Sequence, residues 1–203
     1  MNALKQEAPE PLLSLEEFER LPEEDEFIVE LVRGRVLREP RPLGLRYGLI
    51  ATQLLCPVGS YVEERRNGVA LARTGFLLEK DPPTVRCPVM SFIAAEKLSA
   101  GIPKGWPEFP PDLAVEIVTP STTAEAIQEK VLEYLEKGSR LVWVVVPRTR
   151  SLTTWRPKRD VRLLLEGDIL EGADVLPGFR LPVSEIFEMP EAIWASGNVE
   201  VPR

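Results

Sequence analysis

Pro110–Pro147, PPDLAVEIVTPSTTAEAIQEKVLEYLEKGSRLVWVVVP, is the stretch that decides the fold of this chain. Asp112–Val118 is apolar and β-branched apart from its acidic residues, which predicts a buried strand. The apolar period then changes to 3.6 residues, so we expect a helix over Thr123–Lys137, ended by Gly138. Leu141–Val146 is a second apolar run and predicts a second strand. A strand, a helix and a strand in this order form a βαβ unit, whose strands lie parallel and are joined by a right-handed crossover.

The first predicted strand contains a carboxylate, Glu116, that needs an ion-pair or hydrogen-bond partner. Strands with both faces covered are almost wholly apolar, and an unpaired buried carboxylate is costly. Lys130 on the following helix is the natural partner. The pattern alone favours an ion pair without any further role over a reactive site. Asp112, which opens the strand after two prolines, is expected to be solvated, and Ser121 and Thr122 are expected to cap the helix.

Several motifs along the chain resemble one bacterial family. PDLAVEIVTPST (residues 111–122), Lys130-Val-Leu-Glu-Tyr134 and Trp143-Val-Val-Val-Pro147 are similar to the PDLVVEVLSPST, K-x-x-x-Y and W-[IL]-V-D-P elements of the Uma-two family. Phe27–Val36 resembles the opening hairpin of that family, and VLPGF (residues 175–179) resembles its closing element. The resemblance covers residues 14–188 in order. It implies an α/β fold with a mixed sheet, namely a restriction-endonuclease-like PD-(D/E)XK core with an αβ crossover and added hairpins.

The family resemblance also implies a magnesium site. Glu30 on the first hairpin and Glu116 would hold Mg²⁺, while Lys130 would orient the attacking water or stabilise developing charge. The family has an aspartate on its second strand, and this chain has Val89 there. Asp112 is a poor substitute, because two Cα atoms four residues apart on a strand are roughly 13 Å apart. Glu30 or Glu125 can take the place of the missing acid.

The loss of that aspartate, together with Ala126, Val146 and Tyr47 at other positions where the family is polar, indicates a weak or non-catalytic restriction-endonuclease-like protein. Such a protein would keep the fold to bind nucleic acid or a partner protein, as a homodimer or together with an active paralogue. The alternative is an active Mg²⁺-dependent DNA endonuclease that uses Glu30, Glu116 and Lys130. Magnesium is expected as a cofactor only in this second case.

The amino-acid composition limits the kinds of protein and of site that the chain can form. The 203 residues are 44% hydrophobic, enough for one full core, and contain no histidine and two cysteines, Cys56 and Cys87. We expect both cysteines in the core and no structural zinc site. No apolar stretch is long enough for a membrane span, which predicts a cytoplasmic protein. The formal net charge of −7 is unlike the basic footprint of a DNA-binding domain. The chain also has two basic runs, Arg33–Arg46 and Arg148–Arg159. Each is expected to be a surface loop, or the two together are expected to flank one groove.

Residues 1–13 are expected to form a flexible segment, residues 14–188 one domain, and residues 189–203 a loosely held tail in which Trp194 can dock on a second subunit. Within the domain we expect a helix over Arg46–Arg66, kinked or split at Pro57. Two strands, Gly68–Glu79 and Thr84–Ile93, are expected to form a hairpin.

Overall fold

The computed structural model describes residues 12–40 and 44–188, which form two main sheets and a small third one. The central sheet has the strand order β10 (Asp160–Leu164), β9 (Ser151–Arg156), β8 (Leu141–Val146), β7 (Leu113–Ile117), β6 (Met90–Ala94) and β3 (Gly68–Ala72). The second sheet has the order β2 (Arg35–Pro40), β1 (Phe27–Val32), β5 (Pro83–Arg86) and β4 (Phe76–Lys80). The third consists of β11 (Ile169–Gly172) and β12 (Leu176–Pro182). The chain is therefore a mixed α/β protein with mixed sheets.

The predicted βαβ unit is confirmed. β7 and β8 pair in parallel, from Leu113 beside Leu141 to Ile117 beside Val145, and α3 (Ala124–Glu136) connects them. The N-cap of α3 is Thr123, whose hydroxyl accepts a hydrogen bond from the N–H of Ala126. The prediction of a cap at Ser121 or Thr122 is thus wrong, because the hydroxyls of both bond instead to Thr119.

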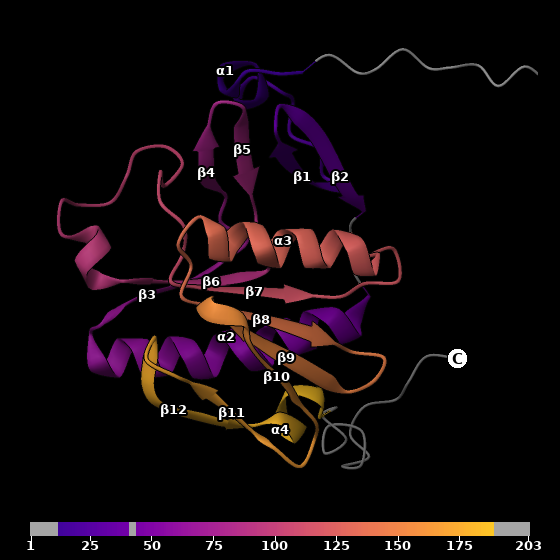
Figure 1. The fold of residues 1–203 in the computed structure, drawn as a ribbon, viewed down its shortest axis with the longest axis vertical. Coiled ribbons are helices and arrows are strands. Elements are labelled where there is room, and N and C mark those ends of the chain that lie inside the picture. Colours follow the sequence, from indigo (N-terminus) through magenta and orange to yellow (C-terminus); the bar gives the residue numbers. More distant parts are fainter. Residues whose placement is uncertain (1–11, 41–43, 189–203) are drawn as a thin grey trace, which may run out of the picture.

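Helices cover the two faces of the central sheet. α2 (Leu45–Arg65) packs on one face with α4 (Val183–Phe187), and α3 packs on the other through Val131 and Tyr134. In Figure 1, α3 lies between the central sheet and the second sheet. α2 is one continuous helix through Pro57, so the predicted split is wrong. Leu54 and Val58 on either side of the proline are completely buried, and this packing offsets the lost backbone hydrogen bond. Cys56 points away from that face and is exposed, which corrects its expected place in the core.

The predicted strands over residues 68–79 and 84–93 are each broken in two. β3 pairs with β6 in the central sheet, whereas β4 pairs with β5 in the second sheet. One long hairpin therefore bends at residues 73–75 on one arm and 87–89 on the other. Arg73 has a positive φ of 45°, and Gly75 lies against the ring of Trp106. This bend turns the tip of the hairpin away from the central sheet and toward the β1–β2 hairpin (Figure 1).

Short elements complete the fold. α1 (Leu15–Glu19) begins with a capping box between Ser14 and Glu17. Leu13, predicted to belong to a flexible segment, donates a hydrogen bond to the carbonyl of Gly34 at 2.7 Å and packs on the second sheet. Two 3-10 turns, η1 (Ala95–Leu98) and η2 (Pro157–Arg159), follow β6 and β9.

Asp112 is buried rather than solvated, with 3% of its surface exposed. Its carboxylate accepts the N–H of Ala94 at 2.9 Å and lies 3.2 Å from the ammonium of Lys97. These two partners compensate its burial and correct the prediction. Asp112 thus ties β7 to the start of η1.

The predicted tail, including Trp194, lies outside the described residues, as do residues 1–11. In the described part of the chain, no helix is long and apolar enough to cross a membrane.

The bend of the long hairpin can be tested at Gly75. A Cβ atom added there would lie 2.1 Å from Cζ3 of Trp106. We expect Gly75→Ala to lower the free energy of unfolding by about 1–3 kcal/mol, because the rigid indole must shift. The matched control is Gly59→Ala in α2, whose added Cβ meets nothing within 4 Å and should stabilise the protein by about 0.5–1 kcal/mol. Urea unfolding of both variants measures the difference, and equal effects would contradict the packing described for Trp106.

Candidate functional site

The site is built on β7, whose side chains alternate between the two faces of the central sheet. Leu113, Val115 and Ile117 point into the core under α2, so Glu116 points toward α3. Glu116 is 4% exposed. Tyr134 on α3 donates its hydroxyl to Glu116 Oε1 at 3.0 Å, and Lys130, one turn earlier, brings Nζ to 3.7 Å from Oε2. The predicted pairing of Glu116 with Lys130 is confirmed.

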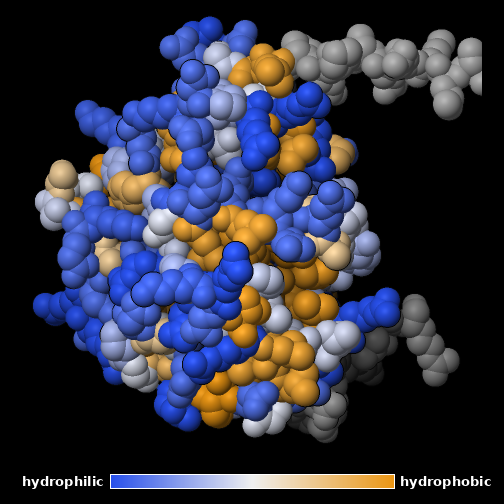
Figure 2. Space-filling model, viewed as in Figure 1, coloured by the Kyte–Doolittle hydropathy of each residue, from blue (hydrophilic) through white to orange (hydrophobic). Residues whose placement is uncertain are grey.

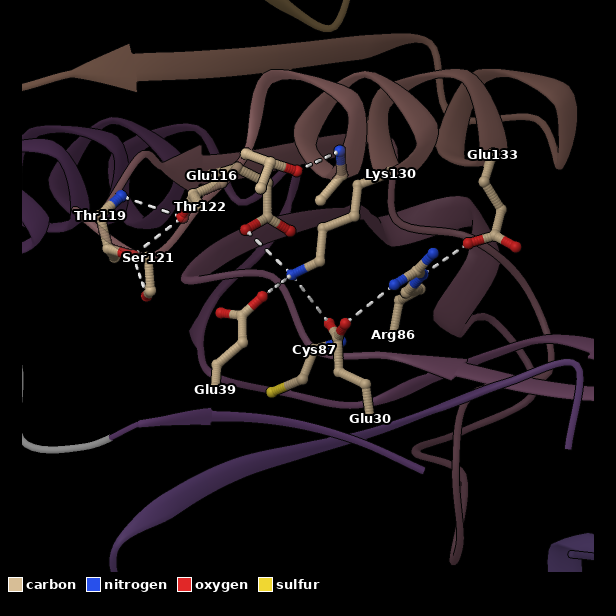
Figure 3. Close-up of polar contacts among 12 residues, drawn as sticks. Glu30, Glu39, Arg86, Cys87, Glu116, Thr119, Ser121, Thr122, Lys130 and Glu133 are labelled. Atoms are coloured by element: carbon tan, nitrogen blue, oxygen red, sulfur yellow. Dashed lines mark hydrogen bonds and ion pairs between the residues drawn. The ribbon is translucent and has the colours of Figure 1, made fainter. Parts of the chain in front are cut away.

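Glu30 reaches the same ammonium from the second sheet. Its Oε1 lies 3.2 Å from Lys130 Nζ and accepts the N–H of Cys87 at 2.8 Å, and its Oε2 lies 3.0 Å from Arg86 Nη1. Glu30 is 1% exposed and Lys130 is 6% exposed. The three residues singled out in the sequence, from β1, β7 and α3, therefore converge on one point, as Figure 3 shows.

A third carboxylate, Glu39 on β2, was missed in the sequence. Its Oε1 lies 2.9 Å from Lys130 Nζ, and its side chain is 42% exposed, so it forms the solvent side of the cluster. The sequence feature that could have located Glu39 is the two-residue turn at Arg33 and Gly34. A two-residue turn fixes the pairing of Glu30 with Leu37 and of Ile28 with Glu39, which sets Glu39 and Glu30 on one face.

A second cation extends the network. Arg86, on β5, bonds Glu30 through Nη1 and Glu133 of α3 through Nε at 2.5 Å. Arg86 could not be recognised from the sequence, because its partners come from β1 and α3, which are distant from it along the chain. We refer below to Glu30, Glu39, Arg86, Glu116, Lys130 and Glu133 as the ion network.

The ion network holds four carboxylates and two cations, so it carries an excess of two negative charges when every carboxylate is ionised. Burial raises the pKa of Glu116 to about 7; Lys130 opposes this rise, and Glu30 and Glu39 add to it. Burial alone would lower the pKa of Lys130, but attraction to Glu116, Glu30 and Glu39 outweighs burial and raises that pKa. The ammonium therefore stays charged, and Glu116 is the group that takes up a proton.

Two neighbouring groups are held neutral. The pKa of Tyr134 is raised well above its usual value, mainly by burial and next by the negative charge of Glu116. Burial also raises the pKa of the Cys87 thiol to about 12, with Glu30 and Glu116 adding to the rise. The phenol thus acts as a hydrogen-bond donor, and the thiol is not a nucleophile at neutral pH.

The residues present do not fit a magnesium ion. Both oxygens of Glu30 and both of Glu116 already face protein donors. Across residues 12–40 and 44–188, no group of three or more His, Cys, Asp or Glu side chains is arranged to hold a metal. Glu125, suggested by the sequence as a stand-in, is exposed in the first turn of α3 and has no contact with the ion network.

Val89 offers no oxygen to the ion network. It directly precedes β6, whose pairing with β7 begins at Met90 opposite Val115. Its half-buried side chain packs against the core cluster under α2, whereas Glu116 points toward α3. The expected place of Val89 at the rim of the acid cluster is therefore not where its side chain packs.

Some of the arginines in the basic runs predicted to flank a groove bind residues of this chain. Arg150 pairs with Glu166 and Arg156 pairs with Asp160, while Arg46 donates to the carbonyl of Pro147. Arg33 and Arg35 line a pocket beside α3 that also holds acidic side chains, whereas Arg156 lines a separate pocket over β9. Arg41 lies outside the described residues.

The fold is shared with a solved α/β structure. A crystal structure from Anabaena variabilis ATCC 29413, described as a "putative nuclease belonging to DUF820", superimposes with a TM-score of 0.77 at 18% sequence identity, covering 86% of this chain and 97% of that chain. At this identity the likeness concerns the fold alone. No curated protein sequence matches the chain.

The sequence profile of the Uma2 (Uma-two) family, described as "Putative restriction endonuclease", matches residues 15–184. The chain therefore belongs to the Uma2 family, as its motifs indicated.

Removing one cation from the ion network should destabilise the fold strongly. We expect Arg86→Met to lower the free energy of unfolding by about 3–5 kcal/mol, because Glu30 is then left buried with one cation fewer. The control is Arg180→Met, which removes an exposed pair with Glu171 and should cost at most about 1 kcal/mol. Chemical denaturation of both variants checks this, and similar losses would mean that the buried network contributes nothing beyond surface pairs.

The raised pKa of Glu116 predicts how stability depends on pH. A carboxyl whose pKa rises from 4.5 in the unfolded chain to about 7 in the fold stabilises the fold fully below 4.5, and this contribution is lost as the pH rises through 7. In that window the stability should fall by up to about 1.4 kcal/mol per pH unit, and less where other groups compensate. Glu116→Gln should flatten the slope in urea unfolding, and an unchanged slope would contradict the assignment.

Proposed function

We propose that this chain is a restriction-endonuclease-like protein of the PD-(D/E)XK type that hydrolyses phosphodiester bonds weakly or not at all. The observation that carries the proposal is the position of Lys130 Nζ, with carboxylates of Glu39, Glu30 and Glu116 at 2.9, 3.2 and 3.7 Å. An ammonium group lies where the acids of the nuclease motif converge. A protein cation therefore neutralises the carboxylates that a metal ion would need.

The ammonium and a magnesium ion compete for the same oxygens. Mg²⁺ requires near-octahedral oxygen coordination and usually keeps several water ligands. Here Glu30 and Glu116 are 1% and 4% exposed, so the site offers little room for such waters. Val89, at the position where the family motif has an aspartate, supplies no oxygen and packs in the core under α2. The buried network is satisfied internally, which favours a structural role for the motif residues over metal-dependent catalysis.

The charge distribution favours a protein partner over DNA. The chain has a formal net charge of −7, and two arginines of the second basic run, Arg150 and Arg156, pair with nearby acids. Strong DNA binding depends on cations that are free to replace counterions along the phosphate backbone. DNA remains the substrate of the alternative, an active Mg²⁺-dependent endonuclease, which the next experiment separates from the proposal.

Metal binding tests the proposal most simply. Calorimetric titration of the wild-type protein with Mg²⁺ or Mn²⁺ should give weak or no binding, and supercoiled plasmid should remain uncut. Val89→Asp restores a carboxylate at the position where the family motif has its aspartate. A rise in metal affinity of about tenfold, a gain of about 1.4 kcal/mol, requires that this side chain turn from the core under α2 to the face of Glu116. The control is Val69→Asp on the edge strand β3, where Val69 is 36% exposed and no acid cluster is near, which should leave affinity unchanged.

The opposite result is equally clear. Wild-type protein that cuts DNA with divalent metal, and loses that activity in both Glu116→Ala and Lys130→Ala, would overturn the proposal. Glu30 or Glu39 would then act as the second metal ligand, and Lys130 would have to leave its place in the ion network.

A further inference from the structure

The end of the central sheet farthest from α2 carries an apolar face that α3 does not cover. Residues directly opposite one another on neighbouring strands share a face. One row across β7 to β10 consists of Ala114, Val142, Trp155 and Val161, and the next of Glu116, Val144, Thr153 and Leu163. Burial falls steadily along both rows. The residues on β7 and β8 are buried, those on β9 are half-buried, and Val161 and Leu163 on β10 are 44% and 62% exposed.

This exposed area is continuous with the apolar surface below α3. Leu165, one residue beyond β10, is 54% exposed and extends the alternation of Val161 and Leu163. Figure 2 shows apolar surface from the lower side of α3 across the region of β9 and β10. An area of this kind marks an interaction surface more often than an accidental exposure.

β10 is also an unprotected edge strand. Within the described residues it pairs only with β9, and its ladder from Asp160 to Leu164 has no bulge, proline or lysine. Its two charged side chains, Asp160 and Arg162, lie on the other face and are 3.6 Å apart. The opposite edge strand, β3, is instead packed by α2 and η1. A flat edge with an apolar face is a template for pairing with another strand.

The charges at the two ends of β10 are opposite. Lys158 and Arg159 precede the strand and are exposed. Within the described part of the chain, their side chains form no hydrogen bond or ion pair. Glu166 and Asp168 follow it and are exposed as well. An antiparallel partner of the same sequence would set the basic end of each strand beside the acidic end of the other. Strand β10 is therefore complementary to itself.

We propose that β10 pairs antiparallel with β10 of a second copy of this chain about a two-fold axis, so that the two central sheets form one continuous sheet. Centring the register on Leu163 sets this residue beside its own copy, Val161 beside Leu165, and Lys158 beside Asp168. Lys158 lies in η2 and Asp168 in the turn after β10, so the register brings these two turns near each other rather than continuing the ladder through them. Asp160 is likewise brought near the turn that holds Glu166. Each of those acids already has an arginine partner in its own chain, Arg156 and Arg150, which limits their repulsion. The proposal does not depend on the chemistry of the ion network.

Sedimentation at micromolar concentrations tests the proposal. The wild-type chain should have twice the mass of one copy. Leu163→Lys places two like charges at the axis and should weaken the dimer by at least about tenfold in dissociation constant. The matched control is Leu132→Lys on α3, where the side chain is 51% exposed and lies away from β10. This control should remain dimeric, and urea unfolding verifies that both variants are folded.

Cross-linking tests the register. In a Cys56→Ser background, Leu163→Cys should form a disulfide-linked dimer on mild oxidation, because residues facing each other at the axis have neighbouring Cβ atoms. Leu132→Cys should not. A monomeric wild-type chain overturns the proposal. It does so even if the edge of β10 is covered by something else, either residues 189–203 or another protein. A dimer that Leu163→Lys leaves intact also overturns it.

Discussion

The ammonium of Lys130 and the three carboxylates around it are the interaction on which the rest of this structure depends. The carboxylates come from β1, β2 and β7, so one charged group joins the second sheet, the central sheet and α3. Burial of any one of these charges alone would be unfavourable, whereas the attraction between the ammonium and the carboxylates offsets part of this cost. Arg86 adds a second cation, whose guanidinium binds both Glu30 of β1 and Glu133 of α3. The residues that the family resemblance assigns to a metal site therefore connect three parts of the fold.

The ion network exists because the long β3–β6 hairpin bends. Without the bend at residues 73–75 and 87–89, the tip of the hairpin would extend the central sheet, and the β1–β2 hairpin would lose its pairing with β5. The bend places β5 beside β1, and the Cys87 N–H that follows β5 bonds Glu30. Trp106 fills the inside of the bend against Gly75. The bend thus brings together the strands that carry the ion network.

The sequence predicted the parts of this structure that depend on local pattern. The βαβ unit follows from the change of period, and Glu116, Lys130 and Glu30 were placed through the family motifs. Glu39 was also predictable, because the Arg33–Gly34 turn sets the register of the hairpin. Arg86 and the bend were not predictable from local pattern, since both depend on contacts between segments far apart in the chain. Asp112 and Cys56 were misplaced because their partners or orientation are set by tertiary packing rather than by neighbours in sequence.

The central claim, that a protein ammonium fills the acid cluster in place of a metal, is tested most directly by a crystal structure grown with Mn²⁺. Anomalous diffraction at the manganese edge distinguishes the metal from the protein's own nitrogen without ambiguity. We predict no anomalous peak among Glu30, Glu39 and Glu116, with Lys130 Nζ within hydrogen-bonding distance of their carboxylates. A manganese peak coordinated by Glu30 and Glu116, with Lys130 displaced, would contradict the account.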